Sequence, residues 1–137
     1  MGLILDSSVL VAAEREGRNA RQALTAIARE IGETEVGISV VTLIELAHGA
    51  ARADTPERRA MREQFIHELL TAIPIHPVTV SLALRTGRLD GEIRTRGTQI
   101  SLADLLIAVT ALELGFGVAT ANLRHFQQVP GLSVVQL

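Results

Sequence analysis

The sequence contains no cysteine, lysine, tryptophan or tyrosine, and each of these absences excludes or disfavours a class of function. Without cysteine, the protein has no disulfide framework, no thiolate zinc site and no cysteine nucleophile. The lack of lysine counts against P-loop enzymes, receiver domains and haloacid-dehalogenase-like phosphatases, which use a lysine in their sites. Three phenylalanines are the only aromatic residues, so no sheet of rings is available on which nucleic-acid bases could stack.

The overall composition is typical of one globular domain. The 137 residues are 47% apolar, which is enough for a single domain with its own core. The net charge of −2 provides no global positive field of the kind that nucleic-acid-binding domains use. No apolar run approaches the length of about 18 residues of a membrane span, and no signal peptide is recognisable before Asp6. We therefore expect a single domain over residues 1–137, in the cytoplasm and without a membrane partner.

Short apolar runs alternate with longer stretches of helical periodicity along the whole chain. Strands are predicted at residues 3–5, 36–39, around 75, 117–120 and 132–135. Helices are predicted at residues 7–16, 18–31, 41–53, 56–72, 78–96 and 101–114, with a break in the fifth near Gly87 or Gly91. Strands separated by helices pair in parallel through right-handed crossovers, so the pattern predicts a layered α/β fold.

Four polar residues lie at strand ends or in the first turns of helices, in otherwise apolar surroundings: Asp6, Glu45, Asp104 and Asn122. Because the carboxyl ends of parallel strands meet at one edge of a sheet, we expect these side chains to lie close together. Three neighbouring carboxylates repel one another, which raises the pKa of at least one of them. A hard divalent cation such as Mg²⁺ removes this repulsion and activates water for attack on phosphate.

Each of these residues also has an ordinary structural interpretation. Asp6 is in position to cap the helix that follows the first strand. Ser101 and Asp104 have the spacing of a capping box. Glu45 would need no function if its side of the helix were solvated. Asn122 is typical of a turn. A functional site is therefore indicated only by the meeting of all four residues at one edge of the sheet.

Four segments of the sequence, in this order and spacing, resemble the PIN domain. These segments are residues 6–10 (DSSVL), 39–46 (SVVTLIEL), 100–108 (ISLADLLIA) and 120–126 (TANLRHF). The total length and the spacing are similar to those of the VapC branch, the toxin ribonucleases of type II toxin–antitoxin pairs. The resemblance covers essentially the whole chain and implies a three-layer α/β/α fold with a parallel sheet of about five strands.

The resemblance also implies an activity, a cofactor and partners. The activity would be a Mg²⁺-dependent endoribonuclease, with Mn²⁺ as the alternative ion, whose metal-activated water hydrolyses RNA phosphodiester bonds. The protein would be a homodimer, alone or within a larger assembly, and a VapB-type antitoxin would hold it inactive. The family's metal-binding acids fall on Asp6, Glu45 and Asp104, and the fourth catalytic position, often Asp, is here Asn122. The family's supporting hydroxyls fall on Ser7 and Thr120.

RNA would have to approach an acidic edge of a slightly acidic protein, and local arginines provide the opposite charge. The candidate phosphate contacts are Arg52, Arg94, Arg96 and Arg124. Any one of them also fits a solvated helix face with pairs four residues apart. His125, beside the same edge, is either a general acid or a packed or capping imidazole.

Two other classes of function stay open. An Asp-dependent phosphohydrolase also begins with a strand and a nucleophilic aspartate, but it needs a second aspartate where this chain has Ser8. A catalytically silent PIN fold that binds RNA or protein is compatible with every residue named above. The apolar residues of the helices at 41–53 and 56–72 either form the core or line a groove for an antitoxin helix, namely Leu43, Leu46, Met61, Phe65, Leu69 and Leu70.

Overall fold

The computed structural model describes all residues, 1–137, and contains one sheet of five parallel strands in the order β3-β2-β1-β4-β5. The elements in chain order are β1 (Leu3–Leu5), α1 (Ser7–Arg15), α2 (Ala20–Ile31), β2 (Val36–Ser39), α3 (Val40–Ala51), α4 (Pro56–Ala72), β3 (Ile75–His76), α5 (Val80–Thr95), α6 (Leu102–Leu114), β4 (Gly117–Thr120), the 3-10 turn η1 (Leu123–His125) and β5 (Val134–Gln136). The layered α/β fold with five parallel strands is confirmed.

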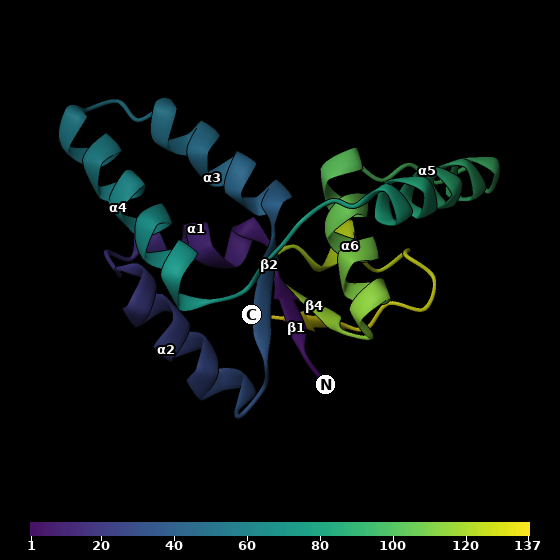
Figure 1. Ribbon diagram of the computed structural model, residues 1–137, viewed down its shortest axis with the longest axis horizontal. Coiled ribbons are helices and arrows are strands. Elements are labelled where there is room, and N and C mark those ends of the chain that lie inside the picture. Colours follow the sequence, from purple (N-terminus) through teal and green to yellow (C-terminus); the bar gives the residue numbers. More distant parts are fainter.

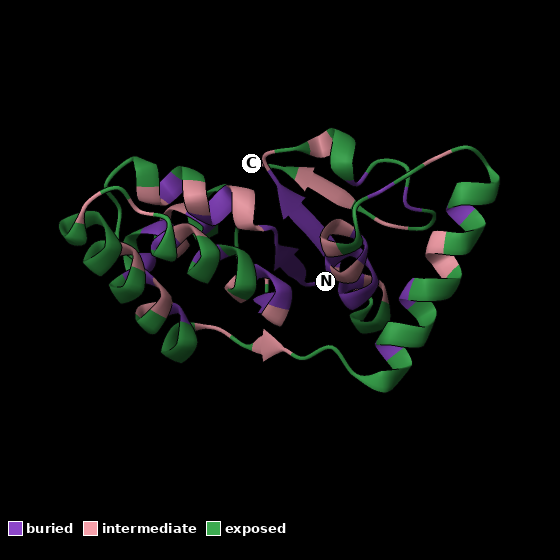
Figure 2. Ribbon diagram, turned by 90° about the horizontal axis from the view of Figure 1, so that it is seen from above, coloured by how far each residue is buried: buried purple, intermediate pink, exposed green.

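The sheet lies between two layers of helices, with α1 to α4 on one face and α5 and α6 on the other (Figure 1). The alternation of side chains along β1 produces this division. Leu3 and Leu5 belong to the core that packs against α1, α2 and α4, whereas Ile4 packs in the core formed with α6. The central strands are buried and α5, at one edge of the molecule, is largely exposed (Figure 2).

The strand order reverses direction between β1 and β4, and this point determines where a site can form. The chain moves from β1 outward to β2 and β3 on one side, and from β4 to β5 on the other. Crevices for ligands form at the carboxyl ends of the strands beside such a switch point. The loops that follow β1 and β4 therefore border the expected site, with the backbone N–H of Asp6 donating to the Ala119 carbonyl at 2.9 Å.

Local signals explain where several helices begin. Thr55 caps α4 by accepting from the Arg58 N–H at 3.1 Å, and Pro56 is the first helical residue, as predicted. The second helix begins at Ala20 rather than at residue 18. Asn19 and Gln22 form a reciprocal capping box, with distances of 2.8 and 2.9 Å, and this box determines the start.

Two further predicted details are wrong. α5 has no break near Gly87 or Gly91, although each glycine costs about 1 kcal/mol relative to alanine in a helix. Packing on α6 keeps the helix continuous, since Leu82 and Ile93 are buried near its two ends. The last strand begins at Val134 rather than at residue 132, because Val134 is the first residue that pairs with β4.

The apolar residues of α3 and α4 are divided between core and surface. Leu46, Phe65 and Leu69 are buried and Leu43 is half-buried, whereas Met61 and Leu70 are 62% and 47% exposed. Most of this set therefore forms the core, and two members remain on the surface. None of the helices combines the length and the apolar character needed to cross a membrane.

The packing predicts a large difference between two leucine truncations. Leu10 of α1 is fully buried, and Leu10→Ala should lower the free energy of unfolding by about 2–5 kcal/mol because it leaves a cavity. Leu102 of α6 is 65% exposed, and Leu102→Ala should change it by no more than about 0.5 kcal/mol. Urea unfolding followed by circular dichroism measures both values. Equal losses would contradict the assignment of Leu10 to the core.

Candidate functional site

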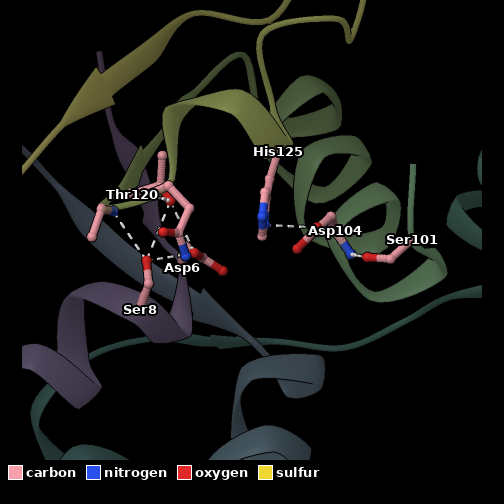
Figure 3. A network of polar contacts seen from close by, with 8 residues as sticks. Asp6, Ser8, Ser101, Asp104, Thr120 and His125 are labelled. Carbon is pink, nitrogen blue, oxygen red and sulfur yellow. Dashed lines mark hydrogen bonds and ion pairs between the residues drawn. The ribbon is translucent and has the colours of Figure 1, made fainter. Parts of the chain in front are cut away.

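The carboxylate of Asp6 is held at the switch point by two hydroxyl groups. Asp6 directly follows β1, is only 4% exposed, and occupies the cap position of α1 without using its side chain as a cap. Its Oδ2 accepts hydrogen bonds from Ser8 Oγ at 2.6 Å and from Thr120 Oγ1 at 2.9 Å (Figure 3). Its Oδ1 receives no hydrogen bond from the protein. The ordinary capping interpretation of Asp6 therefore does not account for its side chain.

The same hydroxyls continue the network into the loop after β4. Ser8 Oγ accepts from the Ala121 N–H at 3.0 Å, and Thr120 Oγ1 accepts from the Asn122 N–H at 2.9 Å. The two hydroxyl oxygens are 3.2 Å apart. These bonds join the first turn of α1 to the end of β4. The orientation of Asp6 is thus fixed by two segments more than 100 residues apart in the sequence.

Asp104 projects from the first turn of α6, and its side chain is 17% exposed. Ser101 Oγ accepts from the Asp104 N–H at 3.2 Å, which supplies one half of the predicted capping box. The carboxylate itself points to His125, whose Nδ1 is 3.2 Å from Asp104 Oδ2 (Figure 3). Burial raises the pKa of Asp104 and the charge of Asp6 raises it further, while the Ser101 hydroxyl and His125 lower it.

Glu45 lies in the second turn of α3, on an exposed side of the helix. Because this side of the helix is solvated, burial gives no reason to assign Glu45 a function. Partial shielding of the carboxylate nevertheless raises the pKa of Glu45, the neighbouring Ser7 hydroxyl lowers it, and the charges of Asp6 and Asp104 raise it further. The three carboxylates therefore lie close enough to repel one another.

The remaining predicted site residues are placed as follows. Thr120 is buried and hydrogen-bonded to Asp6. The Ser7 hydroxyl interacts with the Glu45 carboxylate and not with that of Asp6. Asn122 and Arg124 are exposed at η1, the turn that also holds His125. Arg52 and Arg96 terminate α3 and α5, and Arg94 pairs with Asp90 at 3.0 Å. None of these four arginines pairs with Asp6, Glu45 or Asp104.

Sequence reasoning missed the role of Ser8. Two adjacent serines follow Asp6, and only the geometry of the first turn of α1 decides which hydroxyl returns to the carboxylate. Ser8 also stands at the sequence position where an Asp-dependent phosphohydrolase has its second aspartate. The sequence signal that could have identified Ser8 is this same two-residue spacing.

The donor atoms at this edge fit a hard divalent cation by their chemistry. Asp6, Glu45 and Asp104 supply oxygen ligands, and the repulsion among them is what a bound cation would relieve. No three acidic or histidine side chains are close enough to coordinate one ion as they stand. Mg²⁺ commonly takes only one or two carboxylates and completes its shell with water and substrate phosphate, so a closed cage of protein ligands is unnecessary.

Removing the Ser8 hydroxyl should destabilise the protein more than removing its neighbour. Ser8→Ala removes one of the two hydrogen bonds to the buried Asp6 carboxylate and leaves the Ala121 N–H without a partner, and should cost about 1–3 kcal/mol. Ser7→Ala removes no contact with Asp6 and should cost no more than about 0.5 kcal/mol. Chemical denaturation of the two variants measures the difference. Equal losses would show that the Ser8 network does not stabilise the fold.

The raised pKa of Glu45 predicts a pH-dependent gain of stability in Glu45→Gln. In the folded protein Glu45 binds its proton more tightly than in the unfolded chain, so its cost to stability grows as pH rises through the raised pKa. In EDTA, the variant should therefore have a higher Tm than the wild type at about pH 7.5, and the difference should shrink towards about pH 4. Glu63→Gln, on α4 and without an ion pair, is the control. A Tm gain of the same size in both variants would contradict the repulsion.

Comparison with known proteins identifies the family. Residues 3–132 match the PIN domain. The chain is 36% identical over 98 residues to the tRNA(fMet)-specific endonuclease VapC of Salmonella typhimurium, which covers 71% of each protein. It is 36% identical over 124 residues to ribonuclease VapC10 of Mycobacterium tuberculosis, covering 90% of this chain and 85% of that protein.

A solved structure agrees with these sequence relatives. DNA-bound VapBC from Salmonella typhimurium matches with a TM-score of 0.78 and 27% identity, over 99% of this chain and 98% of that one. The fold, the order of the four motifs and the sequence relatives thus point to the same group. The chain belongs to the PIN-domain family and, within it, to the VapC ribonucleases.

Proposed function

We propose that this protein is a Mg²⁺- or Mn²⁺-dependent endoribonuclease and the toxin of a VapB–VapC pair. The observation that supports this most directly is the mutual repulsion of three carboxylates, Asp6, Glu45 and Asp104, at the switch point of the sheet. A protein that does not use a cation gains nothing from this arrangement. A ribonuclease that must neutralise phosphate and activate water does.

In the proposed mechanism Asp6 and Asp104 would hold the metal ion. Ser8 and Thr120 fix one oxygen of Asp6, so that the free Oδ1 is available to the ion without a side-chain rearrangement. When bound, the ion would polarise a water molecule and neutralise charge on the scissile phosphate. Glu45 either helps to hold the ion or orients the attacking water, and its raised pKa suits a group that accepts a proton from that water.

Two other residues set the charge of the site. Asn122 stands at the fourth catalytic position and carries no charge, so the site is one unit less negative than in relatives with aspartate there. This change should weaken the second of any two metal sites. His125 contacts Asp104 and is half-exposed, so it is available to donate a proton to the leaving oxygen.

The arginines are proposed to contact the RNA backbone. Arg124 is in the same 3-10 turn as His125, which contacts Asp104. Arg52, Arg94 and Arg96 lie at the ends of helices, and Arg94 would have to exchange its partner Asp90 for phosphate. Their contribution would be to position the RNA rather than to read its sequence.

A VapB-type antitoxin and a second copy of the chain are the proposed protein partners. A hollow of about 380 Å³ between the α1–α2 turn and α4 has Met61 and Phe65 in its wall, with polar residues around them. This surface suits an antitoxin helix with apolar anchors, and solved relatives include VapBC complexes. Val80 and Leu84 lie one turn apart and exposed on α5, where a second copy of the chain would cover them.

Cleavage of RNA by the antitoxin-free protein tests the proposal. A panel of structured RNAs, transfer RNAs included, should be cut only when Mg²⁺ or Mn²⁺ is present, and EDTA should stop the reaction. Asp104→Asn should fold but lose at least about 100-fold in cleavage rate, since it removes a ligand and a charge from the site. The Glu63→Gln variant should cut at the wild-type rate.

Other outcomes of this assay have distinct meanings. Cleavage that survives both EDTA and Asp104→Asn would contradict the assignment of the metal site. Tight RNA binding without cleavage, by wild type and Asp104→Asn alike, would favour the alternative of a catalytically silent binding module.

A further inference from the structure

A polar cavity of about 480 Å³ lies at η1, and one residue of its wall, His125, contacts the carboxylate of Asp104. Its wall is formed by η1 and its flanking residues together with the end of β5. The residues that matter for its chemistry are Asn122, Arg124, His125, Gln127 and Gln136. The mechanism proposed above does not use Gln127 or Gln136, and sequence reasoning did not single them out.

The cavity and the carboxylate site share residues. His125 lines the cavity and also lies 3.2 Å from Asp104 Oδ2. Asn122 lines it as well, and its N–H donates to Thr120 Oγ1, which bonds to Asp6. A nucleotide adjacent to a phosphate at the carboxylates would therefore reach this cavity across a single turn of chain.

The chemistry of the wall suits an RNA base. Asn122, Gln127 and Gln136 each offer an amide with both donors and an acceptor, which is what recognition of a base edge requires. Arg124 adds a cation suited to phosphate. His125 is the only ring in the wall and its Nδ1 is engaged with Asp104, so the three amides are the groups that can read the edge of a base by hydrogen bonds.

The wall of this cavity holds no carboxylate, unlike the walls of four other hollows around α1, α2 and α4. One of these four also has three arginines, but each has at least one glutamate in its wall. The cavity beside η1 has none. It combines an uncharged hydrogen-bonding wall with one arginine, next to the site where the chain is most acidic.

We propose that this cavity binds one unpaired nucleotide next to the cleaved phosphate, and that Gln127 and Gln136 determine which base is accepted there. Arg124 would contact the phosphate on the far side of that nucleotide. This inference rests on the proposed ribonuclease function and adds a specificity-determining subsite to it. Gln127 and Gln136 act on the choice and affinity of RNA, not on the chemical step.

Both glutamines can be changed without disturbing the fold. Their side chains are exposed and form no hydrogen bond within the protein. The structural bonds of this region are made by the backbone, for example from the Gln127 N–H to the Leu123 carbonyl and from the Leu137 N–H to the Thr120 carbonyl at 3.0 Å. Gln128 is an exposed neighbour that does not line the cavity, which makes it a matched control.

The test compares Gln127→Ala/Gln136→Ala with wild type and Gln128→Ala on an RNA library randomised around one cleavage site, with the product ends sequenced. Wild type and Gln128→Ala should share a base preference at one position beside the cut. The double variant should lose that preference and cut the preferred RNA about 10-fold more slowly, which is the size of effect expected when one base contact is lost. An unchanged preference in the double variant would overturn the subsite.

Binding of the same library in EDTA separates this inference from the proposed function. If no protein cuts RNA in Mg²⁺ or Mn²⁺, the proposed function fails, but the binding comparison still decides the subsite. A base preference in binding that wild type and Gln128→Ala share and the double variant lacks would support the cavity as a base site. Identical binding profiles for all three proteins would refute it.

Discussion

Repulsion among carboxylates is the constraint on which the functional edge of this protein depends. Asp6, Glu45 and Asp104 come from three separate elements, and each is close enough to influence the charge of another. The fold tolerates this because Asp6 is compensated by two hydroxyls and Asp104 by a histidine that carries charge only when protonated. The repulsion lowers the stability of the folded protein at this site, and a bound divalent cation would restore it.

The sheet topology explains why the site forms where it does. β1 and β4 are neighbours although more than 100 residues separate them, and the chain leaves them in opposite directions. The Ser8–Asp6–Thr120 network closes the seam between these strands. The next few residues, η1 and its flanks, then face the carboxylates on one side and the amide-lined cavity on the other. The segment formed by η1 and its flanks thus links the residues proposed to cleave RNA with those proposed to select the base.

Much of this arrangement could be predicted from the sequence, because it depends on local patterns. The apolar runs at residues 3–5, 36–39 and 117–120 identify the central strands, and Thr55 with Pro56 marks the start of α4. What could not be predicted depends on contacts between distant residues. The choice of Ser8 over Ser7 depends on Thr120, and the continuity of α5 through its glycines depends on α6. The position of Gln136 in the cavity wall depends on the pairing of β5 with Thr120.

Metal binding by the wild-type protein and by Asp6→Asn tests the central claim most directly. Titration of metal-free protein with Mn²⁺, followed by electron paramagnetic resonance of the free ion, reports binding without requiring an RNA substrate. We expect saturable binding of Mn²⁺ to the wild type that Mg²⁺ displaces, and a loss of at least about 10-fold in affinity in Asp6→Asn. Absence of binding to the wild type, or equal affinity in the two proteins, would contradict the central claim.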